Sequence, residues 1–320
     1  MILNPRPYQT EDDYWRIRSF LRQVFMLNNR HMYSWPVARL DYWRWHGIMN
    51  LGDGSLETGI YLWEDRDGEI IAVLNQEEYG QVFLQVHPAY KTDELEDQMI
   101  ALAEEKLRSR SRRGGEVVWL WSDSGDHLRQ EILQKRGFTH ISEEDEHQWL
   151  RNLELPIPKV TMGEGYDIRS LGDSSELPSR SWASWRAFHS DQPDENYAGD
   201  HTWYLNIQNA PLYCRDLDLV AIVPSGEVAA FTTIWYDDVT RCGCFEPVGA
   251  VPEHQRRGLA RALMYEGMRR LKTMGANLVM VSGGSIPANA LYQSVLGPVY
   301  DVYQPWENRW PSMEIKPGNT

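Results

Sequence analysis

Cysteine is scarce in this 320-residue chain, which contains only Cys214, Cys242 and Cys244. Three thiols are too few, and odd in number, for a disulfide framework. Cys242 and Cys244 are separated by one residue, a spacing that places both side chains on the same face of a strand. A zinc site needs a second pair of ligands, and the sequence shows none. We therefore expect structural thiols and no metal ion.

Long apolar runs are also missing. No stretch approaches the roughly 20 apolar residues that a membrane-spanning helix needs. The first residues, MILNPRPYQTEDDYW, lack the basic and then apolar pattern of a secretion signal. We therefore expect a cytoplasmic protein with no membrane partner.

Basic residues are outnumbered, because 32 Lys and Arg stand against 46 Asp and Glu, which gives a net charge of −14. Nucleic-acid binding relies on clustered Lys and Arg, so we expect no nucleic-acid partner. The acidic excess suits a cationic substrate, and it suits solubility equally well. A hydrophobic content of 42% is ordinary for a globular protein with a core. Nothing in these patterns indicates an oligomeric state.

The chain repeats one order of predicted elements. A short extended piece and a helix are followed by a helical segment rich in Trp and Tyr and by strands around Asp67-Gly68 or Ser225-Gly226, pairs typical of hairpin turns. A strand, a proline and an amphipathic helix come next, and then a β-rich run, a short helix, a glycine and a last strand. This order predicts two tandem α/β domains, residues 1–152 and 166–320, joined by a linker at 153–165. Two unrelated α/β halves are the alternative.

The stretch VGAVPEHQRRGLARAL, residues 248–263, places two arginines and a glycine where a strand gives way to a helix. Apolar residues recur at helical spacing from Leu259 onward, so the helix is predicted to begin near Arg257 or Gly258. The first N–H groups of a helix have no intrahelical partner and carry the positive end of its dipole. Glycine adds no Cβ, so a ligand can approach the backbone. This corner suits a pyrophosphate.

These residues resemble a known family. Gln255-Arg-Arg-Gly-Leu-Ala260 resembles the acetyl-CoA signature Q/R-x-x-G-x-G/A of the GCN5-related N-acetyltransferase (GNAT) superfamily, whose preceding strand is matched by residues 248–251 and whose following proline is matched by Pro252. ANALYQSVLGPVY resembles the closing helix of the family, although Gly297-Pro298 replaces the usual Gly-Phe. The resemblance implies a mixed α/β sheet and two tandem acyl-CoA N-acyltransferase domains. The tandem order is similar to that of the mycothiol synthase type, which acts on a small amino-sugar conjugate.

The first half differs at the matching corner. LQVHPAYK is followed by TDELED, without a glycine or an arginine pair. Thr92 is predicted to cap the helix, and the acidic residues of its first turn would repel a phosphate. Leu133 stands at the position of the tyrosine of the family. We therefore expect a degenerate N-terminal domain without coenzyme A, which packs against its partner and closes one side of a substrate cleft.

The resemblance implies acetyl-CoA as the co-substrate of the second half. Backbone N–H groups and arginines at the corner would hold the pyrophosphate, and the strand before it would pair with the pantetheine arm. Where the family often has an asparagine that contacts this arm, the chain offers Ser285, with Asn289 further along. The expected cofactor-binding residues are Val248, Gly249, Ala250, Val251, Arg256, Arg257, Gly258, Leu259, Ala260, Arg261, Ser285 and Asn289.

The resemblance also implies direct transfer of an acetyl group to an amine. Glu246, on the strand that leads into the corner, is the first candidate for the base that deprotonates this amine. Asp237 and Asp238, at the end of the preceding strand, are the second candidates. Tyr292 falls on the frequent general acid of the family, which protonates the departing thiolate. Its alternative is a core aromatic residue whose hydroxyl is bound to the backbone.

The acceptor amine is not identified by any motif. The segment SWRAFHSDQPDENYAGDHTWY is both acidic and aromatic, and it lies where relatives often shape the acceptor cleft. The candidate substrate contacts are Asp191, Asp194, Glu195, Trp203 and Asp237, through charge and ring faces. An exposed acidic loop over a core tryptophan is the alternative. We expect an N-acetyltransferase for a primary amine of a small molecule or peptide, with a non-catalytic acyl-CoA-binding module as the alternative.

Overall fold

The computed structural model describes residues 4–111, 114–159 and 162–311, and it forms two compact units. The N-terminal unit comprises residues 1–37, 51–146 and 301–320, and the C-terminal unit comprises residues 38–50 and 147–300. Neither unit is a contiguous piece of chain. Each unit has its own hydrophobic core.

The N-terminal unit has a mixed sheet in the order β1-β2-β3-β4-β6-β14. Strands β2, β3 and β4 are antiparallel, β4 and β6 are parallel, and β6 and β14 are antiparallel. The strands are β1 (Arg6–Pro7), β2 (Ile60–Glu64), β3 (Ile70–Gln76), β4 (Gln81–Val86), β5 (Ser109–Arg110), β6 (Glu116–Asp123), β7 (Thr139–His140) and β14 (Tyr300–Trp310). The helices are α1 (Glu11–Leu27), α3 (Leu56–Gly59), α4 (Asp93–Lys106) and α5 (His127–Lys135).

The C-terminal unit repeats this topology in the order β8-β13-β12-β11-β10-β9. Strands β9 to β12 are antiparallel, β12 and β13 are parallel, and β13 and β8 are antiparallel. The strands are β8 (Glu146–Asn152), β9 (Asp167–Ser170), β10 (Asp218–Ile222), β11 (Val228–Asp237), β12 (Cys242–Ala250) and β13 (Leu278–Gly283). The helices are α2 (Val37–Tyr42), a π-helix (Trp43–Leu51), α6 (Leu177–Phe188), α7 (Trp203–Gln208), α8 (Leu259–Met274) and α9 (Ile286–Leu296).

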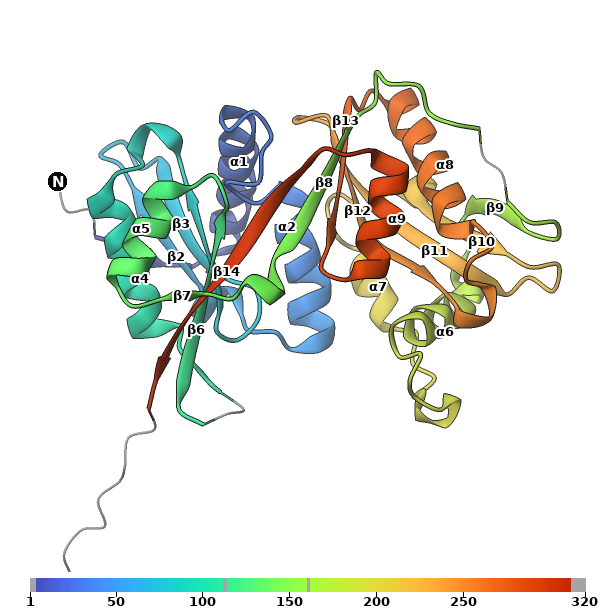
Figure 1. Cartoon of the computed structure of the whole chain (residues 1–320), viewed down its shortest axis with the longest axis horizontal. Coiled ribbons are helices and arrows are strands. Elements are labelled where there is room, and N and C mark those ends of the chain that lie inside the picture. The colour runs from blue at the N-terminus through green and yellow to red at the C-terminus, as the bar shows by residue number, and fades with distance from the viewer. Residues whose placement is uncertain (1–3, 112–113, 160–161, 312–320) are drawn as a thin grey trace, which may run out of the picture. The chain divides into compact units, whose positions relative to one another are not determined.

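The last strand of each sheet comes from the other half of the sequence. Strand β8, which ends the first half, pairs with β13 and places Trp149 in the C-terminal core. Strand β14, which ends the second half, pairs with β6 and places Trp306 in the N-terminal core (Figure 1). The units therefore differ from the contiguous 1–152 and 166–320 domains predicted from the sequence. Alternating apolar residues predict a strand, but they do not specify which sheet it joins.

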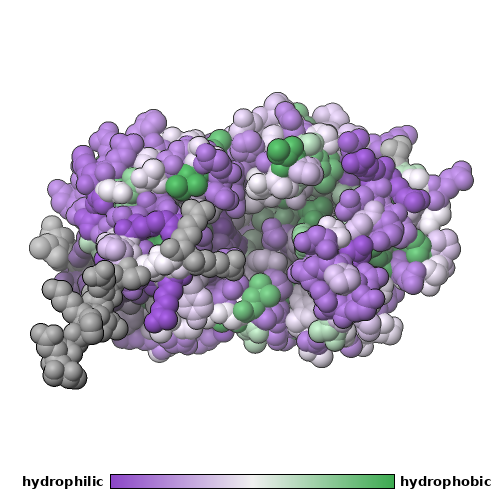
Figure 2. All heavy atoms as spheres, turned by 60° about the horizontal axis from the view of Figure 1, so that its bottom comes forward, coloured by the Kyte–Doolittle hydropathy of each residue, from purple (hydrophilic) through white to green (hydrophobic). Residues whose placement is uncertain are grey.

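Several local predictions are confirmed. The predicted hairpin turns lie between β2 and β3 and between β10 and β11, with Gly68 and Gly226 at φ +82° and +92°. The long amphipathic helix of the second half is α8, which begins one or two residues later than predicted. In the described residues, no helix is both long enough and apolar enough to span a bilayer. The face of the molecule in Figure 2 is mostly hydrophilic, as the 24% charged composition leads one to expect.

Helices cover both faces of the C-terminal sheet. On one face, Gly267 of α8 has no Cβ, and an added Cβ would lie 2.3 Å from Ile234 of β11. On the other face, Phe188 of α6 contacts Phe231 of β11 edge to face. Residues 231 and 234 point to opposite sides of a strand, so α6 and α8 lie on opposite sides of the sheet. The segment 38–50 packs on the α6 side, where Tyr42 meets Trp235.

Candidate active site

Strands β12 and β13 separate part-way along their length. They pair only at Cys242–Leu278, Gly243–Val279 and Cys244–Met280, although β12 continues to Ala250 and β13 to Gly283. Backbone N–H and C=O groups beyond this point face a gap in the ladder, and such groups need another partner. The widening seam between β12 and β13 can therefore accept a ligand that has amide groups of its own.

Successive residues of β12 turn their backbone N–H and C=O groups alternately toward β11 and toward the seam. Backbone groups of successive residues point to opposite edges of a strand. The N–H of Val251 donates to the carbonyl of Ala229, so Val251 turns toward β11. Ala250 turns the other way, and its carbonyl accepts from the Gln255 side chain at 3.1 Å. Of the predicted strand residues, Val248 and Ala250 present their backbone to the seam, whereas Gly249 and Val251 do not.

A bulge interrupts β12 beside the point of separation. Phe245 faces Ile234 and Val248 faces Thr232, so Glu246 and Pro247 together stand opposite a single residue of β11. The carbonyl of Glu246 accepts a 2.6 Å hydrogen bond from the indole of Trp235. A bulge re-aims the side chains of the strand that carries it. This one sets the direction of Glu246, the candidate base.

The start of α8 lies beyond the open end of β12. Its N-cap is Gly258, at φ +79°, with no side-chain cap and no acidic residue in the first turn. Arg256 also has a positive φ, +59°, and residues 255 to 258 are all exposed. Arg257 donates to the carbonyl of Glu253, and Arg261 donates to Ser294 of α9. The N–H groups of Leu259 and Ala260 belong to this uncapped first turn, which is a ready anion site.

Tyr292 of α9 faces the bulge. Its side chain is only 7% exposed, and its hydroxyl makes no hydrogen bond to any residue in the described part of the chain. Burial raises the pKa of Tyr292 above its usual value, and the neighbouring Glu246 and Cys244 raise it further. The phenol therefore stays protonated at neutral pH. Tyr292 also belongs to the hydrophobic core of the C-terminal unit, so its role as the acid stays a prediction.

The two residues expected to contact the pantetheine arm have other partners. The Ser285 hydroxyl caps α9 by accepting from the N–H of Ala288 at 3.4 Å. The Oδ1 atom of Asn289 accepts a 2.8 Å hydrogen bond from the indole of Trp149, a residue of the exchanged strand β8. The Asn289 amide is thus oriented by the first half of the sequence, a connection that the sequence alone does not reveal.

The predicted acceptor contacts are not gathered in one place. Asp191, Asp194 and Glu195 are exposed on the segment between α6 and α7, with Asp194 3.5 Å from Arg186. Trp203 is partly buried, and its indole donates to Ser181. Asp237 is the last residue of β11, and its carboxylate accepts from the N–H and hydroxyl of Thr240 in the turn that follows.

Asp237 faces Cys242, at the end of β12 opposite to the seam. The structure therefore does not bring Asp237, or Asp238 after it, to Glu246 and Tyr292. The carboxylate that lies beside the predicted acid is Glu246.

The segment 38–50 contributes groups that sequence analysis missed. His46 contacts Trp203 with their rings tilted and their centroids 5.4 Å apart, and its Nδ1 atom lies 3.0 Å from the Asn50 amide nitrogen. Asn50 also receives a hydrogen bond from Asn206 of α7. The Trp-rich and Tyr-rich composition predicted a helix here, but not that it packs in the C-terminal unit.

His46 should make the stability of the protein depend on pH. Burial, together with the charge of Arg180, lowers the pKa of His46 from 6.5 to about 4. The unfolded chain therefore binds this proton first, so stability present above pH 6.5 is lost as the pH falls toward 4. Between pH 7 and 5 we expect wild type to lose about 2 kcal/mol more unfolding free energy than His46→Gln. Urea denaturation at both pH values measures this difference, and equal losses would contradict it.

In the N-terminal unit, the start of α4 corresponds to the start of α8, but it is capped by a side chain and has acidic residues in its first turn. The Thr92 side chain caps α4 by accepting from the N–H of Leu95, as predicted, and Glu96 in the first turn forms a buried bidentate pair with Arg129. The register between β3 and β4 has no bulge. The connection before the helix is also shorter in the N-terminal unit. Thr92, the N-cap of α4, follows Pro88 by four residues, whereas Gly258, the N-cap of α8, follows Pro252 by six.

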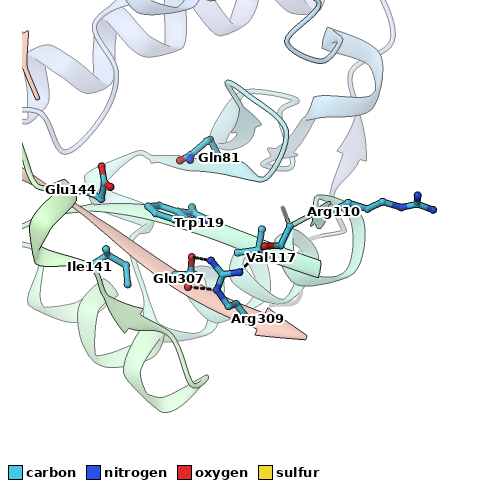
Figure 3. A pocket seen from close by; sticks show the side chains of 9 residues that line it. Gln81, Arg110, Val117, Trp119, Ile141, Glu144, Glu307 and Arg309 are labelled. Atoms are coloured by element: carbon cyan, nitrogen blue, oxygen red, sulfur yellow. Dashed lines mark hydrogen bonds and ion pairs between the residues drawn. The ribbon is translucent and has the colours of Figure 1, made fainter. Parts of the chain in front are cut away.

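A cavity of about 500 Å³ lies elsewhere on the N-terminal unit (Figure 3). Trp119 lies along its floor, the Glu307 and Arg309 side chains are paired with each other, and Arg110 points outward. Gln81, at the start of β4, also lines it. In the C-terminal unit the equivalent strand is β12, and the uncapped start of α8 lies beyond the end of that strand, not at its start. This cavity is therefore not the counterpart of the candidate site.

Residues 178–297 match the model of the Acetyltransferase (GNAT) family. Two mycothiol acetyltransferases are similar in sequence. The one from Pseudarthrobacter chlorophenolicus is 22% identical over 72% of this chain and 70% of its own length. The one from Paenarthrobacter aurescens is 24% identical over 72% and 71%.

Two solved structures have the same fold over the whole chain. A tandem GNAT protein from the clavulanic acid biosynthesis pathway has a TM-score of 0.65 at 13% identity, covering 97% of this chain and 100% of its own. A GCN5-related N-acetyltransferase from Sphaerobacter thermophilus has a TM-score of 0.64 at 18% identity, covering 97% and 96%. At these identities the likeness describes the fold alone.

Proposed function

We propose that the chain is an N-acetyltransferase, because residues 178–297 match the GNAT family model and the chain has the fold of a tandem GNAT protein. It transfers the acetyl group of acetyl-CoA to a primary amine of a small molecule or peptide. The observation that carries this proposal is the alignment, in one unit, of the seam between β12 and β13, the uncapped start of α8, and the pair Glu246 and Tyr292.

The residues present fit coenzyme A. The pyrophosphate is an anion, and the first turn of α8 offers N–H groups, the positive end of a helix dipole and no acidic side chain. Arg256 and Arg257 add positive charge beside it. The pantetheine arm carries two amides, and Val248 and Ala250 of β12 turn their backbone groups into the seam. The N-terminal unit lacks these features, so we assign it a structural role.

Acetyl-CoA supplies an activated acetyl thioester, and the remaining chemistry belongs to the protein. An alkyl amine with a pKa near 10.4 is mostly protonated at pH 7, and losing this proton costs about 4–5 kcal/mol. Glu246, directly or through water, accepts the proton so that the amine nitrogen can attack the thioester carbon. The carbon–sulfur bond breaks, and Tyr292 donates its proton to the departing thiolate.

The proposal is tested by mixing the purified protein with acetyl-CoA and a panel of primary amines. Free thiol is then measured together with acetyl-CoA binding. Amine-dependent thiol release supports the proposal. Acetyl-CoA binding without release from any amine would favour the alternative, a non-catalytic acyl-CoA-binding module. Failure to bind acetyl-CoA would contradict both functions.

Replacing Glu246 with glutamine should lower turnover most at neutral pH. We expect kcat at pH 7 to fall about 100-fold, because the amine must then lose its proton without a base. As the pH rises toward the amine pKa of about 10.4, the deprotonated fraction of the amine increases, so the deficit should shrink. A pH profile of thiol release for wild type and Glu246→Gln measures this. A deficit that is the same at every pH would rule out a role for Glu246 as the base.

A further inference from the structure

Arg180 of α6 is the most unusual charged residue of the C-terminal unit. Its side chain is 0% exposed, and none of its three guanidinium nitrogens forms a hydrogen bond with any residue that the structure describes. A buried charge without hydrogen bonds is costly to fold around, by several kcal/mol even after relaxation. An arginine retained in such a place therefore indicates a partner that is not part of the protein.

The immediate neighbours of Arg180 are aromatic. Its guanidinium carbon lies 3.7 Å from the ring centre of Phe231 and 4.9 Å from that of Tyr204. These rings attract the cation through their faces, but they leave the N–H groups in the guanidinium plane without acceptors. The guanidinium therefore packs against both rings while its N–H donors have no acceptor among the described residues.

The nearby charged and ionisable groups accept no hydrogen bond from the Arg180 guanidinium. Asp218 of β10 is within electrostatic range, but it accepts hydrogen bonds from the hydroxyls of Tyr204 and Tyr213 instead. His46 is also within range, and its depressed pKa keeps it uncharged at neutral pH. In the described residues, no carboxylate lies within ion-pair distance of Arg180.

Arg180 also lies close to the proposed reaction centre. Phe231 is the direct cross-strand neighbour of Gly249 on β12. A Cβ added to Gly249 would lie 2.3 Å from the tip of the Phe231 ring. One aromatic ring therefore separates the guanidinium from the strand that borders the seam. An anion bound to Arg180 would therefore lie on the α6 side of the sheet, close to the strand that also carries Glu246.

We propose that Arg180 binds the carboxylate of the acceptor, so that the acceptor is an α-amino acid or a similar small amine that carries a carboxylate. This inference rests on the proposed function and names its substrate class. The planar fork of a guanidinium matches the two oxygens of a carboxylate. A phosphate dianion fits less well, because one guanidinium charge would leave its second negative charge buried without a counter-charge.

Access to Arg180 must involve the segment between α6 and α7. Residue 181, next to Arg180, holds this segment through a 2.6 Å hydrogen bond from its hydroxyl to the carbonyl of Asp200, and it accepts from the indole of Trp203. The residues from Asp191 to Asn196 are mostly exposed. Displacement of this segment would open the guanidinium to a small acceptor.

The test compares α-amino acids with their carboxamides, which have the same size and an amine but no carboxylate. Wild type should acetylate the acids with the higher kcat/KM. Arg180→Met keeps a long apolar side chain between the two rings and removes the donors. It should lower kcat/KM for the acids about 100-fold, mainly through KM, because two charge-assisted hydrogen bonds are lost. Its kcat/KM for the carboxamides should change by less than about 3-fold.

Arg180→Lys and Arg169→Gln are the matched variants. Lysine keeps the charge without the fork, so it should recover part of the loss for the acids. Arg169 is an arginine of β9 that pairs with Glu176, and its replacement should leave the ratio of acid to carboxamide unchanged. Direct acetyl-CoA binding and thermal unfolding, measured on every variant, report whether the protein is folded.

The outcomes separate this inference from the proposed function. Thiol release with carboxamides at rates equal to or above those with the acids would overturn the carboxylate assignment and leave the acetyltransferase assignment intact. Equal losses for both members of each pair in Arg180→Met would assign Arg180 a structural role and overturn the inference. A protein that binds no acetyl-CoA would overturn the proposed function and this inference together.

Discussion

Gly258→Glu is expected to lower the affinity for acetyl-CoA by about 100-fold or more, the equivalent of about 3 kcal/mol. Gly258 is the N-cap of α8 at φ +79°, a backbone conformation that residues with a Cβ adopt only at a cost. A carboxylate here would also occupy the positive end of the helix and repel the pyrophosphate. Isothermal titration with acetyl-CoA measures the loss.

Two variants separate charge from backbone strain. Gly258→Ala adds the strain without the charge, so it should lose only about 5-fold in affinity. Gly226→Ala adds a Cβ at φ +92° in the β10–β11 hairpin, far along the chain from α8, and should bind acetyl-CoA like wild type. Wild-type affinity in Gly258→Glu would mean that the start of α8 is not the pyrophosphate site.

Tyr292→Phe is expected to lower kcat by about 100-fold while acetyl-CoA affinity stays nearly unchanged. This is the low end of the range for general acid catalysis, because a thiol with a pKa near 8.5 is already a tolerable leaving group. The Tyr292 hydroxyl has no hydrogen-bond partner in the described structure, so its removal breaks no contact that holds the site. Steady-state kinetics with any active amine measure the change.

The pH dependence of turnover gives an independent check on Tyr292. Because burial raises the pKa of Tyr292 above 10, the phenol remains protonated, and able to act as an acid, across the ordinary working range. Any loss of wild-type turnover between pH 7 and 9 should therefore persist in Tyr292→Phe. If Tyr292→Phe turned over as fast as wild type with every active amine, the assignment of the general acid would be wrong.

Sequence patterns predicted the features that depend on neighbours along the chain. The turn at Gly226, the cap at Thr92 and the uncapped start of α8 follow from local backbone chemistry. The difference between the starts of α4 and α8 could also be predicted, because acidic residues in the first turn of a helix are apparent from the sequence. The roles of Glu246 and Tyr292 remain predictions that the experiments above address.

The features that sequence analysis missed depend on distant parts of the chain. The orientation of Asn289 by Trp149 requires β8 to join the sheet of the other half. Arg180 lies in the stretch LPSRSWASW, where a charged residue between serines is typical of a solvated helix face. Only the packing of α6 against β11 shows that its guanidinium is enclosed between rings.

Because strands β8 and β14 are exchanged, neither half of the sequence forms a complete sheet without the other. A polypeptide cut inside the linker would leave the first half without β14 and the second without β8, so each sheet would end in an unsatisfied edge. The second half would also lose the segment that carries His46. The C-terminal unit therefore needs strand β8 and the segment 38–50 from the first half of the sequence to complete its sheet and its packing.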